Sequence, residues 1–317
     1  LTPVAKINPV NIGGVVVSNA TLHNEDEINR KDIRIGDTVK MERAGDVIPH
    51  VVSVDLKKRT GNIKKYVFPN NCPSCGSSVI KEYNPITKKY DAVRRCSSEA
   101  YNCEKMSIEK IKHFISKDAL NIDGLGKKVV EKFWDLNFIR YPQDIFKLNY
   151  KKIESLEGWG ELSVSNLKYS IEKSKKVSLE RLIFSLGIRH IGQENAKLIA
   201  YNLKNIENLK KINSKFNYEN FLNIDGIGEI QINSLKNFFS NDINLNVIKE
   251  LSIYLEIKNF EKKFDGKFKS KSFLITGKLL GISRAEAKSL IESNSGKIQS
   301  SVNNKLDYLI TGEKPNC

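Results

Sequence analysis

The sequence has 317 residues, of which 40% are hydrophobic, so it is long enough for two or three domains with buried cores. Its formal net charge is +15, with 52 lysine and arginine residues against 37 aspartate and glutamate residues. This excess favours a polyanionic partner such as nucleic acid, although the abundance of lysine over arginine also reflects the codon bias of AT-rich genomes. No apolar run approaches the ~18 residues needed to span a bilayer, which excludes a helical membrane protein and favours a cytoplasmic one.

Residues 1–70 contain short runs rich in β-branched residues. The runs are Val15–Val17, Thr38–Met41 and Val47–Val54. A Gly-Gly pair and two Gly-Asp pairs lie before or between them and indicate turns. Short strands at this spacing predict a small β-barrel in this part of the chain.

Residues 71–105 contain four of the five cysteines, in the pattern C-x2-C-x20-C-x6-C. The four are Cys72, Cys75, Cys96 and Cys103. Four thiolates complete the tetrahedral shell of a structural zinc ion, and the segment has too few apolar residues to fold without one. The alternative is four unrelated free thiols, but their clustering and the knuckle-forming Pro73 and Gly76 favour zinc. No role is assigned to the fifth cysteine, Cys317.

Residues 106–258 are expected to be helical, because apolar residues recur at positions i, i+3 and i+4, as in Val129, Val130 and Phe133. From residue 264 onward the pattern changes to strand, helix and strand, which predicts a small α/β unit. Its expected elements are Ser272–Thr276, Arg284–Glu292 and Tyr308–Ile310.

A motif of the form hydrophobic-x-Gly-hydrophobic-Gly repeats within the helical region about every 34 residues. Its copies are Ile122–Gly126, Leu156–Gly160, Ile188–Gly192 and Ile224–Gly228. An amphipathic helix is expected after each copy, which is the signature of a helix-hairpin-helix motif. The glycines adopt backbone angles closed to other residues and bring main-chain N–H groups close to a phosphate. Such contacts read the backbone of a nucleic acid, so binding should be independent of its sequence.

The residues expected to contact DNA in these hairpins are the glycines and the two lysines that follow the first copy. They are Gly124, Gly126, Lys127, Lys128, Gly158, Gly160, Gly192, Gly226 and Gly228. The third copy has His190 in place of its first glycine, and we interpret this residue as a loop histidine and not as a catalytic base. Trp159 is interpreted as a packing residue. Four ordinary glycine-containing turns are the alternative, which the near-constant period disfavours.

The order of these modules, together with four longer motifs, resembles the bacterial NAD+-dependent DNA ligases. The motifs are Leu1–Lys6 with Pro9-Val10, Val17–Asn24, Arg34–Asp37 and Arg43–Pro49. The resemblance covers the whole chain and implies that the small barrel is an OB-fold. It also implies a BRCT domain at the end, because Phe273–Gly277, Arg284–Lys288 and Ser295–Lys297 match that domain's first strand and turn, first helix and Gly-Gly-Lys position.

The resemblance implies that this chain is a piece of a longer protein. Both ends look cut, and the later BRCT helix that carries a tryptophan is missing. Ligases of this family use NAD+ and Mg2+ to adenylate a lysine in a Lys-x-Asp-Gly motif, which lies upstream of Leu1 in the family. Lys263–Gly266 matches that motif by chance, and we interpret Lys263 as a linker lysine. We therefore expect no catalytic residue here and no self-adenylation by this chain alone.

The expected partner is nicked double-stranded DNA, bound by a monomer without regard to base sequence. In the OB-fold we expect DNA or active-site contacts from five side chains. They are Thr21, His23, Lys31, Arg34 and Arg43. The alternative is that Thr21, His23 and Asn24 form a turn network and that the basic residues are a solvated face.

The overall prediction is a multidomain α+β protein. Its parts are an OB-fold over 1–70, a four-cysteine zinc finger over 71–105, a helix-hairpin-helix domain over 106–258 and a partial BRCT domain over 264–317. The predicted function is the DNA-gripping part of a ligase that seals 5′-phosphate/3′-hydroxyl nicks in replication and repair. Two alternatives are a non-catalytic DNA-repair scaffold and a nuclease subunit, although no compact carboxylate cluster for a nuclease is visible.

Overall fold

The structure is a computed structural model that describes most of the chain. The described residues are 1–42, 49–61, 63–84, 87–213, 215–222, 224, 226–260, 266–277, 279–282, 284–299, 301–303 and 306–313. Arg43 and the first three residues of the Lys263–Gly266 motif lie outside them. None of the described helices is both long and apolar enough to cross a membrane.

The chain forms two compact units, each made of discontinuous segments. The first unit contains Leu1–Lys117, Asn121–Glu172 and Asn237–Tyr254. The second contains Asp118–Leu120, Lys173–Lys236 and Leu255–Cys317. The first two glycine repeats therefore belong to the first unit, and the last two repeats belong to the second.

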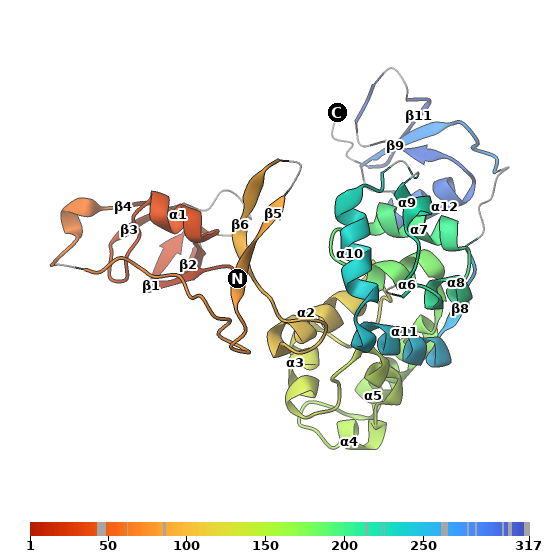
Figure 1. Ribbon diagram of the computed structural model, residues 1–317, viewed down its shortest axis with the longest axis horizontal. Coiled ribbons are helices and arrows are strands. Elements are labelled where there is room, and N and C mark those ends of the chain that lie inside the picture. Colours follow the sequence, from red (N-terminus) through yellow and green to blue (C-terminus); the bar gives the residue numbers. More distant parts are fainter. Residues whose placement is uncertain are drawn as a thin grey trace. The chain divides into compact units, whose positions relative to one another are not determined.

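The first unit begins with a four-stranded sheet in the order β1-β2-β4-β3, red and orange in Figure 1. Its strands are β1 (Val4–Ile12), β2 (Val15–Thr21), β3 (Val39–Glu42) and β4 (His50–Val54). Gly13 and Gly14 join β1 to β2 with positive φ angles of 59° and 81°, which suit a two-residue hairpin turn. The short helix α1 (Glu25–Arg30) follows β2 and buries Ile28.

The sheet confirms the predicted strands at Val15–Val17 and Thr38–Met41 and in the described part of Val47–Val54, whose first two residues lie outside the described ones. Strand β1 and helix α1 were not predicted. Strand β1 contains Pro9 and three asparagine or lysine residues, which weaken a strand pattern. Helix α1 has six residues, too few for a helical periodicity to be visible, and its only clear signal is the N-cap Asn24.

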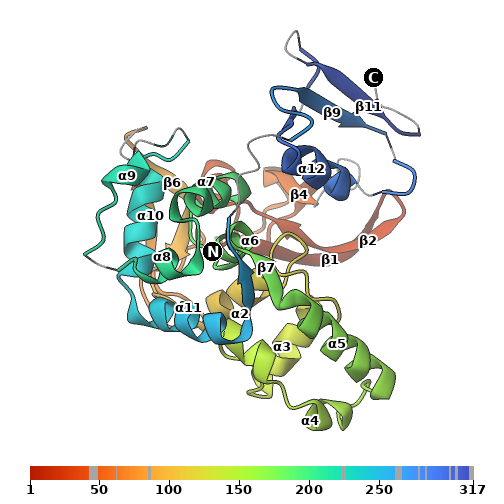
Figure 2. The ribbon, with the colours of Figure 1, turned by 90° about the vertical axis from the view of Figure 1, so that its right-hand side faces the viewer.

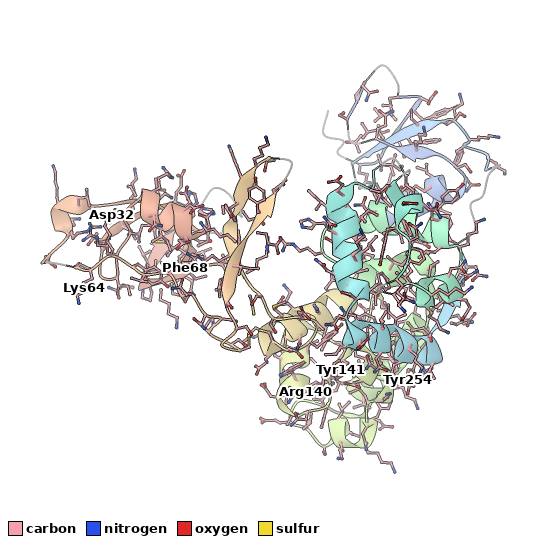
Figure 3. All side chains as sticks on the ribbon, in the orientation of Figure 1. Asp32, Lys64, Phe68, Arg140, Tyr141 and Tyr254 are labelled. Carbon is pink, nitrogen blue, oxygen red and sulfur yellow. The ribbon has the colours of Figure 1, made fainter. Side chains whose placement is uncertain are left out.

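An ion-pair network fixes the loop between α1 and β3. The Arg59 guanidinium lies 2.7 Å from Asp37 Oδ1 and 2.6 Å from Asp32 Oδ2. Asp32 is labelled in Figure 3. Arg34 completes the network with a 2.9 Å contact to Asp32 and a 2.6 Å bond to the carbonyl of Ile63. The Asp37 side chain is 1% exposed, so its charge depends on these partners.

The remainder of the first unit contains the first two hairpins and a returning helix. Its helices are α2 (Glu104–Phe114), α3 (Lys127–Asp135), η2 (Pro142–Lys147), α4 (Tyr150–Glu154), α5 (Glu161–Ser174) and α11 (Asp242–Tyr254). Helix α11 packs along η2, where Tyr254 (Figure 3) stacks on Phe146 with 6.0 Å between ring centroids. Lys147 and Glu250 add an ion pair of 3.0 Å to this contact.

The first two hairpins pack reciprocally, each turn against the second helix of the other. The Asp123 N–H in the first turn donates to Ser170 Oγ of α5 at 2.7 Å. Trp159 in the second turn lies on Phe133 of α3, with 5.5 Å between ring centroids. This confirms the interpretation of Trp159 as a packing residue.

The second unit contains the last two hairpins and a small α/β module. Its helices are α6 (Leu179–Ser185), α7 (Gln193–Leu203), α8 (Ile206–Lys210), α9 (Glu219–Leu222), most of α10 (Glu229–Phe239), and α12 (Arg284–Ser293). Two short strands, β7 (Lys176–Ser178) and β8 (Glu256–Lys258), pair in parallel. They were not predicted, because three residues carry no periodic signal.

The α/β module is a parallel sheet in the order β10-β9-β11. Its strands are β9 (Ser272–Thr276), β10 (Lys297–Ile298) and β11 (Tyr308–Thr311). Figure 2 shows β9 and β11 side by side, with α12 beneath them. The predicted strand, helix and strand are thus confirmed, and the two-residue strand β10 is an addition.

The Arg59 network predicts an acid-sensitive contribution to stability. Hydrogen bonds from Arg59 hold the pKa of Asp37 below its ordinary value. Asp37 therefore stabilises the fold above pH ~4, and this contribution disappears as the pH falls through the lowered folded-state pKa. We expect Asp37→Asn to destabilise the protein by about 1.5–3 kcal/mol at pH 7, through loss of charge-assisted hydrogen bonds. The difference from the parent chain, measured by denaturant unfolding, should shrink toward pH 3; a constant difference would contradict the prediction.

Candidate metal centre and nucleic-acid interface

The four predicted cysteines come together in one cluster. Their Sγ atoms all lie within 4.8 Å of one another. The Sγ atoms of Cys75 and Cys96 are 3.4 Å apart, and those of Cys72 and Cys103 are 4.0 Å apart. A tetrahedral zinc ion with Zn–S bonds of about 2.3 Å requires sulfur atoms about 3.8 Å apart. The cluster therefore has the size and the donor set of a structural zinc site.

Three different elements bring the cysteines together. Cys72 and Cys75 lie in a knuckle, where the Gly76 N–H donates to the Cys72 carbonyl at 2.8 Å and Gly76 takes a φ of 76°. Cys96 ends β6 (Lys89–Cys96), which pairs with β5 (Val79–Asn84). Cys103 is the N-cap residue of α2. Among the described residues, the buried apolar core around the cluster consists of Val79 and two of the cysteines, with Leu1 and Met106 partly buried against it. Because this core is so small, the metal would supply the folding energy.

The thiols differ in acidity. Hydrogen bonding with Ser77 lowers the pKa of Cys75 to about 6, which favours the thiolate form of this ligand near neutral pH. Burial raises the pKa of Cys96 to about 12. A divalent cation at the centre of the cluster would reverse that effect, because its charge stabilises the thiolate.

The glycine turns have the backbone geometry that the sequence predicts. The first glycine of three turns has a positive φ: 88° at Gly124, 83° at Gly158 and 93° at Gly226. His190 stands at the same position of the third turn and also takes a positive φ, of 59°. The left-handed conformation is thus common to all four turns, and histidine tolerates it at some energetic cost.

The backbone conformation does not explain why the second position of the turns is a glycine. Gly126 and Gly192 have ordinary φ angles of −64° and −80°. A Cβ atom built on Gly126, Gly160 or Gly192 would meet nothing within 4 Å. Neither backbone strain nor packing inside the chain therefore requires a glycine at these positions, and the space beside each one is open to a group from outside the chain.

Two of the hairpin helices also begin without side-chain caps. Helices α3 and α7 start at Gly126 and Gly192 and receive no hydrogen bond from a capping side chain. By contrast, asparagine side chains cap helices outside these turns. They are Asn24 on α1, Asn149 on α4 and Asn205 on α8. Open N-terminal amides and the positive end of the helix dipole are features that favour an anion.

The first hairpin has the most cationic turn of the four. Lys127 and Lys128 are exposed in the first turn of α3, which contains no acidic residue. Two positive charges at a helix N-terminus oppose the helix dipole, and a bound anion would offset this cost. The second, third and fourth hairpin helices have Glu161, Glu194 and Glu229 in that turn.

The OB-fold residues predicted to contact DNA divide into two groups. Thr21 Oγ1 accepts the His23 N–H at 3.0 Å, and Asn24 Oδ1 accepts the Glu27 N–H at 2.9 Å. The alternative prediction of a turn network therefore describes these contacts, while His23 remains exposed and can still contact DNA.

The two basic residues Lys31 and Arg34 bond within the chain. Lys31 Nζ donates to the Val51 carbonyl at 2.6 Å, and Arg34 belongs to the Arg59 network. Their side chains are only 13% and 21% exposed, which favours a structural role over a DNA contact. Arg43 lies outside the described residues.

Sequence reasoning missed the basic residues that link separate segments. Arg94 of β6 binds Glu25 of α1 through two hydrogen bonds of 2.7 and 3.0 Å. Arg59 binds Asp37 and Asp32 across more than twenty residues of chain. Neither pair has a local spacing that could have revealed it.

Family models match three parts of the chain. The NAD-dependent DNA ligase OB-fold domain matches residues 1–63, the helix-hairpin-helix motif matches 181–248, and the BRCA1 C Terminus (BRCT) domain matches 263–316. The chain is also 68% identical over 316 residues to the DNA ligase of Pelagibacter ubique. The chain belongs to the family of bacterial NAD-dependent DNA ligases. The resemblance and the fold class predicted from the sequence are thereby confirmed.

Other DNA ligases are similar over the same length. The chain is 44% identical over 316 residues to the DNA ligase of Sulfurihydrogenibium azorense and 46% identical over 320 residues to that of Wolbachia pipientis subsp. Culex pipiens. These alignments cover 99% of the chain but only 47%, 43% and 48% of the three relatives. The chain thus spans about half the length of the ligases that it matches.

The cysteine cluster predicts one zinc ion per chain. We expect Cys103→Ser to abolish stoichiometric zinc binding and to lower the melting temperature, because the remaining apolar core is too small to hold the knuckle. Zinc content by atomic emission and thermal unfolding by circular dichroism measure the two effects. Cys317→Ser is the matched control and should change neither. Full zinc retention in the Cys103→Ser variant would contradict the assignment.

Proposed function

We propose that this chain is the DNA-gripping part of an NAD+-dependent ligase that seals nicks between a 5′-phosphate and a 3′-hydroxyl in duplex DNA. The relatives that are named DNA ligase support this role, as does the family of its OB-fold. The parent protein would use NAD+ and Mg2+ in replication and repair, within the bacterial cytoplasm. The expectation that it acts as a monomer stays a prediction.

The observation that carries the proposal is the set of uncapped glycine N-termini. At Gly126 and Gly192 the chain needs neither the conformational freedom nor the space that glycine provides. A non-bridging phosphate oxygen, however, must approach the amides of the first helical turn closely, and a Cβ atom would block it. Glycine at the N-cap therefore favours phosphate binding over capping by the chain's own side chains.

The chemistry of these contacts explains the kind of partner. Amide N–H groups and the ammonium groups of Lys127 and Lys128 recognise the sugar-phosphate backbone and not the base edges. A ligase must act at a nick in any sequence, so backbone recognition fits its task. Holding the duplex on both sides of the nick would align the 3′-hydroxyl with the adenylated phosphate, which lowers the barrier through positioning.

The zinc cluster would support this grip without chemistry of its own. Four cysteine ligands would leave no open position for water or substrate, so the ion would be structural. Zinc would hold the end of β6 against the start of α2, the helix that leads into the first hairpin. Within the described residues we assign no catalytic role, and the adenylated lysine would belong to a different part of the parent protein.

A pair of variants in the first hairpin tests the proposal. Gly126→Ala should weaken binding to a nicked duplex about tenfold, because the methyl group displaces the phosphate, while the melting temperature changes little. Gly124→Ala is the contrast: the φ of 88° at this position is strained for alanine and predicts loss of stability. Fluorescence anisotropy and thermal unfolding measure both effects. Unchanged affinity in Gly126→Ala would contradict the role of this turn.

The charge contribution is tested by salt dependence. Replacing Lys127 and Lys128 by alanine should reduce the slope of log K against log salt by about 2, because each lysine would neutralise one phosphate. The matched control replaces Lys151 and Lys152, an equally exposed pair on the asparagine-capped helix α4.

Incubation of the chain with NAD+ should yield no covalent AMP adduct, and an adduct would refute the proposed division of labour.

A further inference from the structure

The fourth glycine turn differs from the other three in how its amide is used. The Gly228 N–H donates to the side-chain oxygen Oε1 of Gln231 at 3.1 Å. Gln231 is the third residue of α10, and a glutamine at this position commonly reaches back to the N-cap amide. An amide oxygen thus occupies the place where a phosphate oxygen would bind.

The residues at the corresponding position of the other hairpin helices do not accept this hydrogen bond. They are Val129 in α3, Ser163 in α5 and Asn195 in α7. Valine has no acceptor, and Asn195 instead donates its Nδ2–H to the His190 carbonyl at 3.2 Å. Among the described residues of the four turns, a side-chain acceptor on the second glycine's amide is present in the fourth turn alone.

The charges around the fourth turn also disfavour an external anion there. Glu229 begins α10, so a carboxylate already lies near the positive end of this helix dipole. The first hairpin has Lys127 and Lys128 at the matching positions. One turn is therefore satisfied by its own side chains, whereas the other attracts an external anion. The match of the helix-hairpin-helix family model to residues 181–248 nevertheless includes the fourth turn.

We propose that Gln231 is an internal substitute for phosphate that closes the fourth hairpin to DNA until its side chain rotates away. The inference rests on the proposed function and adds a specific residue to it. A phosphate must displace the Gln231 oxygen from the Gly228 amide before it can bind there. The fourth hairpin therefore holds phosphate more weakly than the first, and the identity of residue 231 sets the difference.

Substitutions of opposite effect at residue 231 test this inference. Gln231→Ala opens the amide and should tighten binding of the whole chain to a nicked duplex about twofold to fivefold, the range of one exposed hydrogen bond. Gln231→Glu places a charged acceptor on the same amide and should weaken binding about fivefold. Asn233→Ala and Asn233→Asp are the matched controls, because Asn233 is exposed on the same helix and undergoes the same changes of size and charge. Fluorescence anisotropy at fixed salt is the measurement.

Two outcomes would overturn the inference. One is unchanged or weaker binding by Gln231→Ala; the other is a Gln231→Glu effect no larger than that of Asn233→Asp. If the variants at Lys127 and Lys128 reduce the salt slope while Gln231→Ala has no effect, the proposed function stands and this inference fails. If neither set alters binding, both fail.

Introducing the same glutamine cap into the first hairpin provides a test that does not depend on the stability of α10. Val129→Gln introduces the same acceptor at the third position of α3, where it can reach the Gly126 amide. We expect this variant to weaken binding to the nicked duplex by about twofold to fivefold, with an unchanged melting temperature. An affinity equal to that of the parent chain would show that a glutamine in this position does not compete with phosphate.

Discussion

Unsatisfied amides at the start of a helix are the interaction on which the molecule's proposed role depends. Water satisfies such groups in most proteins, or a serine, aspartate or asparagine side chain does so. This chain uses asparagine in that way on α1, α4 and α8, yet places glycine at the start of α3 and α7. Helices α2 and α6 also begin without a side-chain cap, but the contrast with α1, α4 and α8 means that the missing caps on α3 and α7 do not reflect a general lack of capping residues.

The open amides are useful only if the turns are held rigidly. Reciprocal packing makes the first two hairpins rigid, since the Asp123 amide donates a hydrogen bond to Ser170 of α5 and Trp159 lies on Phe133 of α3. The cysteine cluster would supply rigidity upstream, where Cys103 is the N-cap residue of α2 and few apolar residues are available. Rigidity therefore comes from aromatic packing in one place and from a metal in the other, according to what each segment can bury.

The sequence predicted the features that a rare residue type or a repeated motif marks, and it failed for ion pairs between common residues. Cysteines are rare in the chain and cluster in one segment, the glycine turns repeat, and the helices after these turns begin where the motifs place them. Arg59 and Arg94, in contrast, find their carboxylates across distant parts of the chain, and no pattern announces such pairs. The assignment of Arg34 to DNA likewise did not anticipate its bonds to the neighbouring Asp32 and to the Ile63 carbonyl.

The four repeats look equivalent in sequence, but their chemistry is not. A glycine motif fixes the backbone of each turn, whereas the anion affinity is set by the next few residues: two lysines after Gly126, and a glutamate and a glutamine after Gly228. In the proposed DNA-gripping role, a strong first contact combined with a weaker, displaceable one would permit the chain to hold a duplex firmly at one point while it adjusts at another. Uniformly strong contacts would oppose such adjustment, because every phosphate would have to be released together for the proposed ligase to move along the strand or to leave a sealed product.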